Sequence, residues 1–375
     1  MMNRRIDDFS IRDQQSIIPP FPKGGREDWR AAAELIASAG FHGDFSLHPL
    51  TGGANNRVFL VEVNNGSRAL LKAYFQHPDD PRDRLRAEFS FSSFAWENGL
   101  RCLPKPLGCD WQNRLGLYEF VPGRQLLPHE VNEGAVRQAL DFYRELNRHK
   151  ELPGAKSLPE GSEACFTLGN HLRCVERRLQ RLRGVFASLT DAFGLRDDYS
   201  EINRQAAHFI RNELSEAWRG VADSVRKRAG ELGLALDTEI ARQDRCLSPS
   251  DFGFHNAILS DDGRLRFIDF EYAGWDDPAK TVCDFFCQPA VPVPLDYYDI
   301  FVEEMISNLS EPEMYRQRIA LLLPVYQLKW CCILLNDFLP VGGQRRRFAG
   351  STVDQEERKA KQLQKARQAL QNLTR

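Results

Sequence analysis

The most constraining feature of the chain is the stretch from Asp251 to Asp269, in which three oxygen-bearing side chains flank a short β-hairpin. Asp251 is followed five positions later by Asn256. Short apolar runs on both sides of the turn Ser260–Gly263 then predict two antiparallel strands within residues 257–270. Because a hairpin brings its two ends together, we expect Asn256 and Asp269 to lie side by side. Asp251, on the preceding loop, would point into the same pocket.

These three side chains together suit phosphoryl transfer. An amide oxygen from Asn256 and a carboxylate from Asp269 are hard ligands of the kind that bind Mg²⁺. Asp251 would accept or orient the proton of an attacking hydroxyl group. An aspartate and an asparagine at this spacing also occur as loop caps, so the hairpin and the second aspartate give the pattern its specificity.

Residues earlier in the chain offer matching parts for a nucleotide. Gly52 and Gly53 lie in a turn between predicted strands, where backbone amides can approach phosphates closely, although a glycine pair is also a common turn. Lys72 is a charged residue in an apolar strand. It either faces solvent or binds phosphate while a helix carboxylate holds it. Glu88 in the following predicted helix is the preferred partner, and Glu97 is the second choice.

Secondary-structure signals divide the chain into a small β-rich lobe and a larger helical lobe. An Asn-Gly turn joins two runs of β-formers before residue 75, whereas apolar residues recur at helical spacing after residue 123. At the junction, we expect the backbone of Glu119 and Val121 to hydrogen-bond an adenine edge, a main-chain contact that residue type does not reveal. We therefore predict an α+β chain with four parts: an N-terminal extension with one helix (1–44), a β-rich nucleotide-binding lobe (45–121), a helical catalytic and acceptor-binding lobe (122–341) and a polar C-terminal tail or helix (342–375).

Charge and composition exclude several other classes of protein. Lys and Arg number 50 and Asp and Glu 52, and this balance gives no support for nucleic-acid binding. No apolar run approaches the roughly 18 residues that a membrane span needs, and the first residues form no apolar signal segment. The nine cysteines are irregularly spaced and fit free thiols in a reducing compartment. We expect a cytoplasmic protein with no membrane partner.

In their order along the chain, these features resemble the aminoglycoside phosphotransferase and choline kinase-like family. The resemblance covers about residues 45–287 and is most specific at Phe267–Pro278, which reads Phe-Ile-Asp-Phe-Glu-Tyr-Ala-Gly-Trp-Asp-Asp-Pro. It implies a bilobal protein-kinase-like fold and ATP- and Mg²⁺-dependent transfer of a γ-phosphoryl group to a hydroxyl of a small, sugar-like or amino-alcohol molecule. The roles that it implies are a catalytic base (Asp251), Mg²⁺ ligands (Asn256 and Asp269), an α/β-phosphate contact (Lys72) with its ion-pair partner (Glu88), and a nucleotide-binding turn (Gly52, Gly53 and Asn56).

The sequence departs from the family at the catalytic loop. The family usually has His-Gly-Asp there, whereas this chain has Pro249-Ser250-Asp251. His255 stands where the family often has a small residue. The resemblance also places candidate acceptor contacts around the loop, with ordinary loop packing as the alternative for the first and last of them: His255, Glu271, Tyr272 and Trp275.

Two other functions and one further ligand class are weighed against this interpretation. A pseudokinase would bind nucleotide or a protein partner without turnover. Such a scaffold would need none of four polar residues that this chain retains: Lys72, Asp251, Asn256 and Asp269. A protein kinase would need an Ala-Pro-Glu segment at activation-loop distance after Asp269, and none is present. Arginines crowd residues 173–183 and 345–347. We interpret them as solvated helix faces, with binding of anionic ligands as the alternative. Because residues 155–245 are not strongly acidic, polycationic antibiotics are not the expected substrates.

Overall fold

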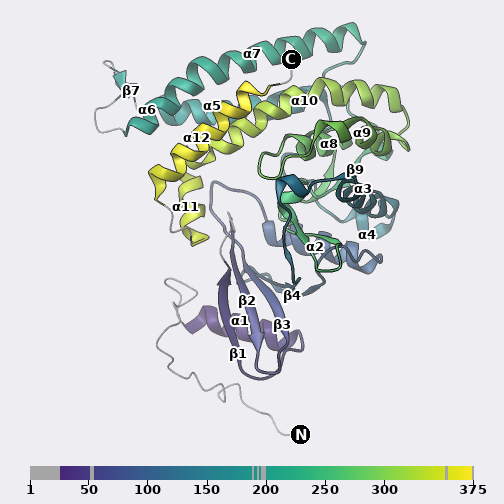
Figure 1. Cartoon of the computed structure of the whole chain (residues 1–375), viewed down its shortest axis with the longest axis vertical. Helices are drawn as coiled ribbons and strands as arrows, with labels where there is room; N and C mark the ends of the chain where they lie inside the picture. The colour runs from purple at the N-terminus through teal and green to yellow at the C-terminus, as the bar shows by residue number, and fades with distance from the viewer. Residues whose placement is uncertain are drawn as a thin grey trace.

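Two lobes, one β-rich and one helical, make up the structure, a computed structural model that describes residues 26–50, 55–187, 190–191, 194–195, 200–350 and 354–373. The predicted α+β, two-lobed arrangement is confirmed. The small lobe carries one antiparallel sheet, and the larger lobe is built mainly of helices (Figure 1). The predicted Gly52 and Gly53 lie outside the described residues.

The small lobe is a five-stranded antiparallel sheet in the order β1-β2-β3-β5-β4. The predicted hairpin is present, and its turn closes through a hydrogen bond from Gly66 N to Val63 O of 2.8 Å. Gly66 has φ +84°, a conformation that glycine adopts without a steric penalty. The strands are β1 (Phe45–Leu50), β2 (Arg57–Val63), β3 (Arg68–Ala73), β4 (Pro106–Asp110) and β5 (Leu115–Glu119).

One helix lies on each face of this sheet. Helix α1 (Arg26–Ser38) buries Ala32 and Ile36 against the sheet residues Phe59, Val61 and Leu71. The N-terminal helix therefore shares a hydrophobic core with the sheet. Helix α2 (Arg84–Glu97) begins where the Asp83 side chain accepts a hydrogen bond from Arg86 N, a standard N-cap.

The large lobe surrounds the long helix α10 (Pro312–Leu334), which packs against α5, α7, α8 and α12 (Figure 1). The expected helix across residues 206–232 is continuous, but its middle, Phe209–Leu214, winds as a π-helix. The remaining helices are α3 (Glu133–Arg148), α4 (Pro153–Lys156), α5 (Leu168–Ala187), α6 (Glu201–His208), α7 (Ser215–Glu231), α8 (Pro278–Cys287), α9 (Tyr298–Ile306), α11 (Pro340–Phe348) and α12 (Gln355–Gln371).

Helix α10 corrects the expectation that no apolar run of the chain approaches the length of a membrane span. The segment Pro312–Phe338 is long and apolar enough to cross a membrane by length and composition, although charged residues interrupt its apolar run. In the structure 56% of the apolar window is buried inside the lobe. Core helices pass the same test, so this segment alone is weak support for a membrane span.

Short strands of the large lobe bring the chemistry-bearing loops to the lobe junction. Strands β10 (Ala257–Leu259) and β11 (Leu265–Phe267) form the predicted hairpin, and β6 (Arg124–Gln125) pairs with β10. Strands β9 (Cys246–Ser248) and β12 (Gly274–Asp276) pair beside them. The remaining two strands, β7 (Thr190–Asp191) and β8 (Gly194–Leu195), form a separate ribbon. All nine cysteines are free thiols, as expected.

Candidate active site

Lys72 projects from the middle strand of the small-lobe sheet toward two carboxylates, those of Glu88 and Asp269. Strand alternation puts it on the face that carries Tyr74, opposite the face that packs on α1. Its Nζ donates to both carboxylate oxygens of Glu88, at 2.7 and 3.0 Å, and to Asp269 Oδ1 at 2.8 Å. Burial opposes the lysine charge, but Asp269 and Glu88 raise its pKa. Glu88, the preferred partner, is therefore the residue that pairs with Lys72.

The hairpin brings Asn256 and Asp269 together as expected. Ala257 pairs with Phe267, and Ile268 N donates to Asn256 O at 2.9 Å, so Asn256 lies beside the residue that precedes Asp269. The Asn256 amide nitrogen donates to the backbone oxygen of Asp251 at 3.0 Å. That bond uses the amide nitrogen and leaves the amide oxygen for a cation.

The donor set fits Mg²⁺ bound together with a nucleotide. Among the described residues, no group of three or more His, Cys, Asp or Glu side chains forms a metal cage. Mg²⁺ typically takes one or two protein oxygens, with phosphates and water completing its shell. Asn256 and Asp269 supply two such oxygens. Asp269 adopts a left-handed backbone with φ +67°, which turns its carboxylate toward Lys72.

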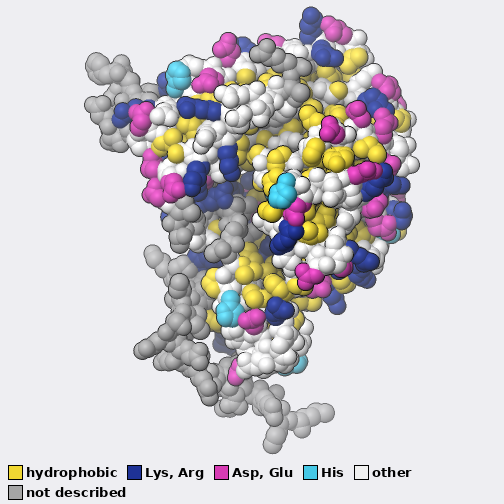
Figure 2. All heavy atoms as spheres, in the orientation of Figure 1, with side chains coloured by type: hydrophobic (Ala, Val, Ile, Leu, Met, Phe, Trp, Pro, Cys, Tyr) yellow, Lys and Arg dark blue, Asp and Glu magenta, His cyan; other side chains and the backbone are white. Residues whose placement is uncertain are grey.

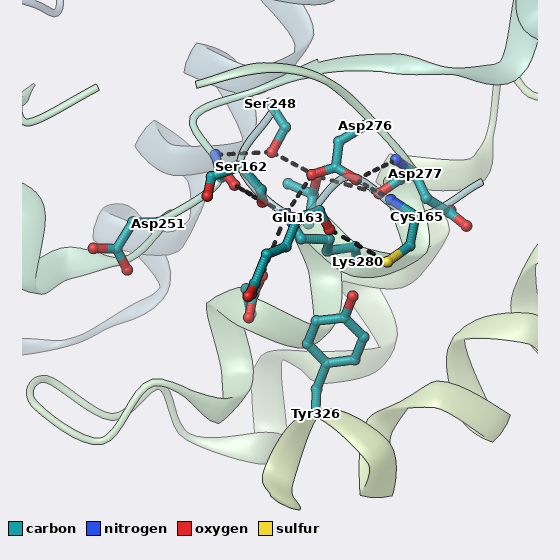
Figure 3. Close-up of polar contacts among 12 residues, drawn as sticks. Ser162, Glu163, Cys165, Ser248, Asp251, Asp276, Asp277, Lys280 and Tyr326 are labelled. Atoms are coloured by element: carbon teal, nitrogen blue, oxygen red, sulfur yellow. Dashed lines mark hydrogen bonds and ion pairs between the residues drawn. The ribbon is translucent and has the colours of Figure 1, made fainter. Parts of the chain in front are cut away.

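Asp251 lies on a loop that is held in a strained conformation. The preceding Ser250 has φ +65°, which costs a residue with a Cβ about 1–3 kcal/mol. Buried Lys280 donates to Ser250 Oγ at 2.9 Å, and Ser250 N donates to Ser248 Oγ at 3.0 Å (Figure 3). These bonds hold a serine at a position where the family usually has glycine.

Sequence reasoning missed the buried network behind this loop. Lys280 donates to Asp276 and lies 3.8 Å from Asp284, and both acids raise its pKa even though burial opposes the charge. The signal was partly present in the sequence, because Lys280 is four residues from each aspartate. Asp284 shares its face of helix α8, whereas Asp276 ends β12 just before that helix. The network connects helix α8 to the Asp251 loop through Ser250.

His255 faces Asp251, the predicted catalytic base. Its Nε2 lies 3.2 Å from Asp251 Oδ1, and its ring meets Trp330 edge-on at 6.3 Å. Its Nδ1 is buried and has no hydrogen-bond partner among the described residues. Burial opposes charge in both groups, but their mutual attraction raises the pKa of His255 and lowers that of Asp251. His255 is thus placed to hold Asp251 in its ionised form.

The other three candidate acceptor contacts form hydrogen bonds with residues of the protein itself. Glu271 is 2% exposed and accepts hydrogen bonds from the amides of Asn55 and Asn56. The Tyr272 hydroxyl accepts from Asn55 at 3.0 Å. Trp275 lies in β12, and its indole nitrogen donates to Ala155 O at 2.9 Å. Glu271 and Tyr272 therefore join the two lobes.

The predicted nucleotide contacts of the small lobe are only partly brought to the site. Asn56 is buried, with its side-chain oxygen accepting from Phe75 N at 3.2 Å, so it supports the end of the glycine-rich segment. Glu119 ends β5, and its carboxylate accepts from Lys105 N at 3.1 Å. Val121 follows on the connection to β6, which places the backbone of this segment where the lobes join. Its contact with adenine stays a prediction.

Comparison with known proteins assigns the family. Residues 46–300 match the phosphotransferase enzyme family, APH. The chain belongs to this family. No protein among the curated sequences matches it. As a member of the family, this phosphotransferase is a kinase that acts on hydroxyl acceptors, and the match gives no support to the pseudokinase alternative.

Solved structures share the fold of this phosphotransferase at low sequence identity. Spectinomycin phosphotransferase APH(9)-Ia in complex with ADP and spectinomycin has a TM-score of 0.56 and 11% identity, covering 91% of this chain and 98% of the other. Choline kinase LicA from Streptococcus pneumoniae scores 0.52 at 16% identity, with 92% and 98% covered. Plasmodium vivax ethanolamine kinase scores 0.51 at 14%, with 86% and 82% covered. These likenesses establish the kinase-like fold.

Proposed function

We propose that this protein transfers the γ-phosphoryl group of ATP, with Mg²⁺, to a hydroxyl group of a small molecule. The observation that carries the proposal is the convergence of Lys72, Asp269, Asn256 and Asp251 at the lobe junction from three separate segments. The complexes of related folds with ADP support nucleotide use. Mg²⁺ held by Asn256 and Asp269 would neutralise phosphate charge.

Each protein group has a defined task in the proposed reaction. Lys72, fixed by Glu88, would hold the nucleotide phosphates. Asp251 would orient the acceptor hydroxyl and take its proton as the new O–P bond forms. The bond between the γ-phosphorus and the bridging oxygen breaks at the same time, and its electron pair leaves with ADP. The ionised form of Asp251, which His255 favours, is the form that this role requires.

The nucleotide part of the proposal can be tested without knowing the acceptor. We would measure thermal unfolding of the wild type and of Asp269→Asn with ATP, ADP or GTP, each with and without Mg²⁺. A nucleotide at 100 times its Kd stabilises a fold by about 2.7 kcal/mol, which raises Tm by several degrees. We expect this rise in the wild type with Mg²⁺ and a much smaller one in the variant. Asp261→Asn, in the exposed turn of the same hairpin, is the matched control.

The transfer part is tested by replacing the proposed base. With an acceptor in hand, Asp251→Asn is expected to lower kcat by about 10²–10⁴-fold, the usual contribution of a general base. The Mg²⁺–ATP-dependent rise in Tm should persist in this variant. Unchanged turnover in Asp251→Asn would sink the assignment, and the absence of any nucleotide effect on the wild type would sink the kinase proposal as a whole.

A further inference from the structure

Beside the catalytic loop, one carboxylate faces three guanidinium groups. Glu163 Oε2 accepts from Nε and Nη2 of the buried Arg178, at 3.0 and 2.5 Å. Arg181 Nη2 and Arg82 Nη2 each lie 3.8 Å from Glu163 Oε1. Glu163 has φ +55°, a left-handed conformation that is uncommon for a residue with a Cβ. We call Glu163, Arg82, Arg178 and Arg181 the arginine cluster.

The arginine cluster adjoins the proposed base. Ser250, next to Asp251, donates to Ser162 O at 3.4 Å, and Arg82 Nε donates to Ser162 Oγ at 2.8 Å. In Figure 3, Glu163 lies below Ser162, and Asp251 lies to the left of both with its carboxylate pointing away from Glu163. The charge of Lys329 lowers the pKa of both carboxylates, which places both within its electrostatic range. The loop that carries the proposed base and the loop that carries Glu163 are therefore hydrogen-bonded neighbours.

The positive and negative charges at the arginine cluster do not cancel. Glu163 neutralises one of its three arginines. Asp80 contacts Arg82 at 3.0 Å but also holds Arg84 at 2.5 Å, and Glu271 lies 3.5 Å from Arg84. These acids therefore leave an excess of positive charge at the cluster. A surface with an excess of one sign of charge attracts ligands of the opposite sign.

A second group of arginines extends the positive surface across the lobe junction. Helix α11 carries Arg345, Arg346 and Arg347, and Figure 2 shows Lys and Arg side chains gathered over this helix. Arg345 Nε is buried without a hydrogen-bond partner among the described residues. The charge of Arg84 lowers the pKa of Arg345, after burial, which places it on the same side of the junction.

We propose that the acceptor carries an anionic group, a phosphate ester or a carboxylate, that binds to Arg82 and Arg181 while its hydroxyl faces Asp251. The inference rests on the proposed function and names the substrate class of the same site. Arg178 is occupied by Glu163, whereas Arg181 lies 3.8 Å from that carboxylate. Arg82 donates through Nε to Ser162 and through Nη1 to Asp80, and its Nη2 lies 3.8 Å from Glu163. Each guanidinium has five donors in a planar fork that matches phosphate and carboxylate oxygens.

The same charges disfavour a cationic acceptor. An amino sugar or amino alcohol would place its ammonium group against several guanidinium groups, because the carboxylates of Glu163 and Asp80 are already engaged by arginines. Like charges in such a site are repulsive. The arginines of α5 were interpreted from sequence as a solvated face. Arg178 and Arg181 correct that interpretation, because one is buried and both turn toward Glu163.

The anion site can be tested directly with inorganic phosphate as the probe. Full-length protein is first saturated with Mg²⁺ and a non-hydrolysable ATP analogue, so that the nucleotide site is filled. Phosphate binding is then measured by titration calorimetry in the wild type, Arg181→Gln and Arg183→Gln. Arg181 is 53% exposed, so its replacement should preserve the fold. Arg183 lies on the same helix but donates to Ser215 at 3.0 Å, which makes it the matched control.

We expect Arg181→Gln to weaken phosphate binding about tenfold or more, and Arg183→Gln to bind as the wild type does. Arg82→Gln is the second variant and should show the same loss. Equal phosphate binding by the wild type and Arg181→Gln, or no phosphate binding by the wild type, would overturn the proposal. Neither result touches the Mg²⁺–nucleotide rise in Tm, so failure here is distinct from failure of the kinase assignment.

A matched panel of acceptors then separates the two anionic classes. Phosphoryl transfer from labelled ATP is compared for a neutral hexose, its phosphate ester, its uronic acid and its amino sugar. A lower KM for the phosphate ester or for the uronic acid identifies the anionic group, and Arg181→Gln should raise that KM with little change in the KM for ATP. A preference for the neutral or amino sugar would overturn the anionic acceptor while leaving the phosphotransferase proposal intact.

Discussion

Three side chains at the site stand on left-handed backbone, although each has a Cβ. Glu163, Ser250 and Asp269 have φ of +55°, +65° and +67°. Such residues persist only where their surroundings hold them, and they concentrate at functional sites. Here each is tied to a charged partner: Arg178 on Glu163, Lys280 on Ser250, and Lys72 on Asp269. The left-handed backbone therefore orients these three side chains toward their charged partners.

The His255–Asp251 pair predicts a specific dependence of stability on pH. The pKa of His255 is raised in the folded state, so the pair stabilises the fold fully below the ordinary histidine pKa of about 6.5. That stabilisation is lost as pH rises through the folded-state pKa. We therefore expect the stability difference between wild type and His255→Gln to be largest near pH 6 and to shrink at higher pH. Thermal unfolding across pH 5.5–9 measures it.

Asp251→Asn provides the control for this pH dependence. Replacing the carboxylate removes the attraction that raises the pKa of His255. In the Asp251→Asn background, the stability change caused by His255→Gln should therefore depend little on pH. A stability difference between wild type and His255→Gln that is constant across the range would contradict the pairing.

At the scale of secondary-structure elements, β3 and α2 are joined by a buried ion pair that serves the site. Glu88 lies in the middle of α2 and takes bonds from Lys72 and from the Tyr74 hydroxyl at 2.7 Å. Tyr74 in turn contacts the Tyr118 hydroxyl at 2.8 Å. A helix, two strands and the loop after β11 therefore meet near Lys72. Hydrogen bonds to Glu88 and Asp269 fix the position of its Nζ.

Removing one partner of this ion pair should cost far more than removing both. In Lys72→Met the Glu88 carboxylate stays buried without its cation, and we expect a loss of about 3–5 kcal/mol in unfolding free energy. The double variant Lys72→Met, Glu88→Gln removes the orphaned charge and should recover much of that loss. Urea unfolding measures both. A double variant less stable than the single one would show that Glu88 stabilises α2 independently of Lys72.

At the scale of the whole molecule, the C-terminal helices complete a core that the family match does not reach. The match ends at residue 300, whereas α10 and α12 lie beyond it and bury Leu363 and Ala366 in the main core. Helix α11 reaches back to the small lobe, where Arg57 Nε donates to Phe348 O at 2.6 Å and the Phe348 ring contacts Phe75 at 5.5 Å. The tail thus ties the two lobes together.

This arrangement predicts that α12 contributes strongly to stability. Leu363 is 1% exposed, and Leu363→Ala should lower the unfolding free energy by about 2–5 kcal/mol through the cavity that it leaves. The neighbouring Gln364 is exposed, so Gln364→Ala should change it by less than about 0.5 kcal/mol. Denaturant unfolding compares the two. Equal effects would mean that α12 is dispensable for the fold.

Much of the site was predictable because its signals are local. The hairpin that joins Asn256 to Asp269 follows from a turn between two short strands, and the pairing of Lys72 with Glu88 follows from a strand and the next helix. The orientation of His255 was not predictable, because its neighbour Trp330 is distant in sequence. Likewise, the bonds of Glu271 to Asn55 and Asn56 join segments more than 200 residues apart, at separations of 216 and 215.

The sequence by itself determined the kind of chemistry, since residue types at short spacing specify which oxygens and which cation a loop or hairpin can present. The tertiary structure alone decided which charges gather beside the Asp251 loop. Arg82 comes from the small lobe, Arg181 from α5 and Glu163 from a loop, and a linear pattern could not bring them together. Long-range packing sets which charges share a space, because burial and Coulomb attraction depend on distance in the folded chain rather than along it.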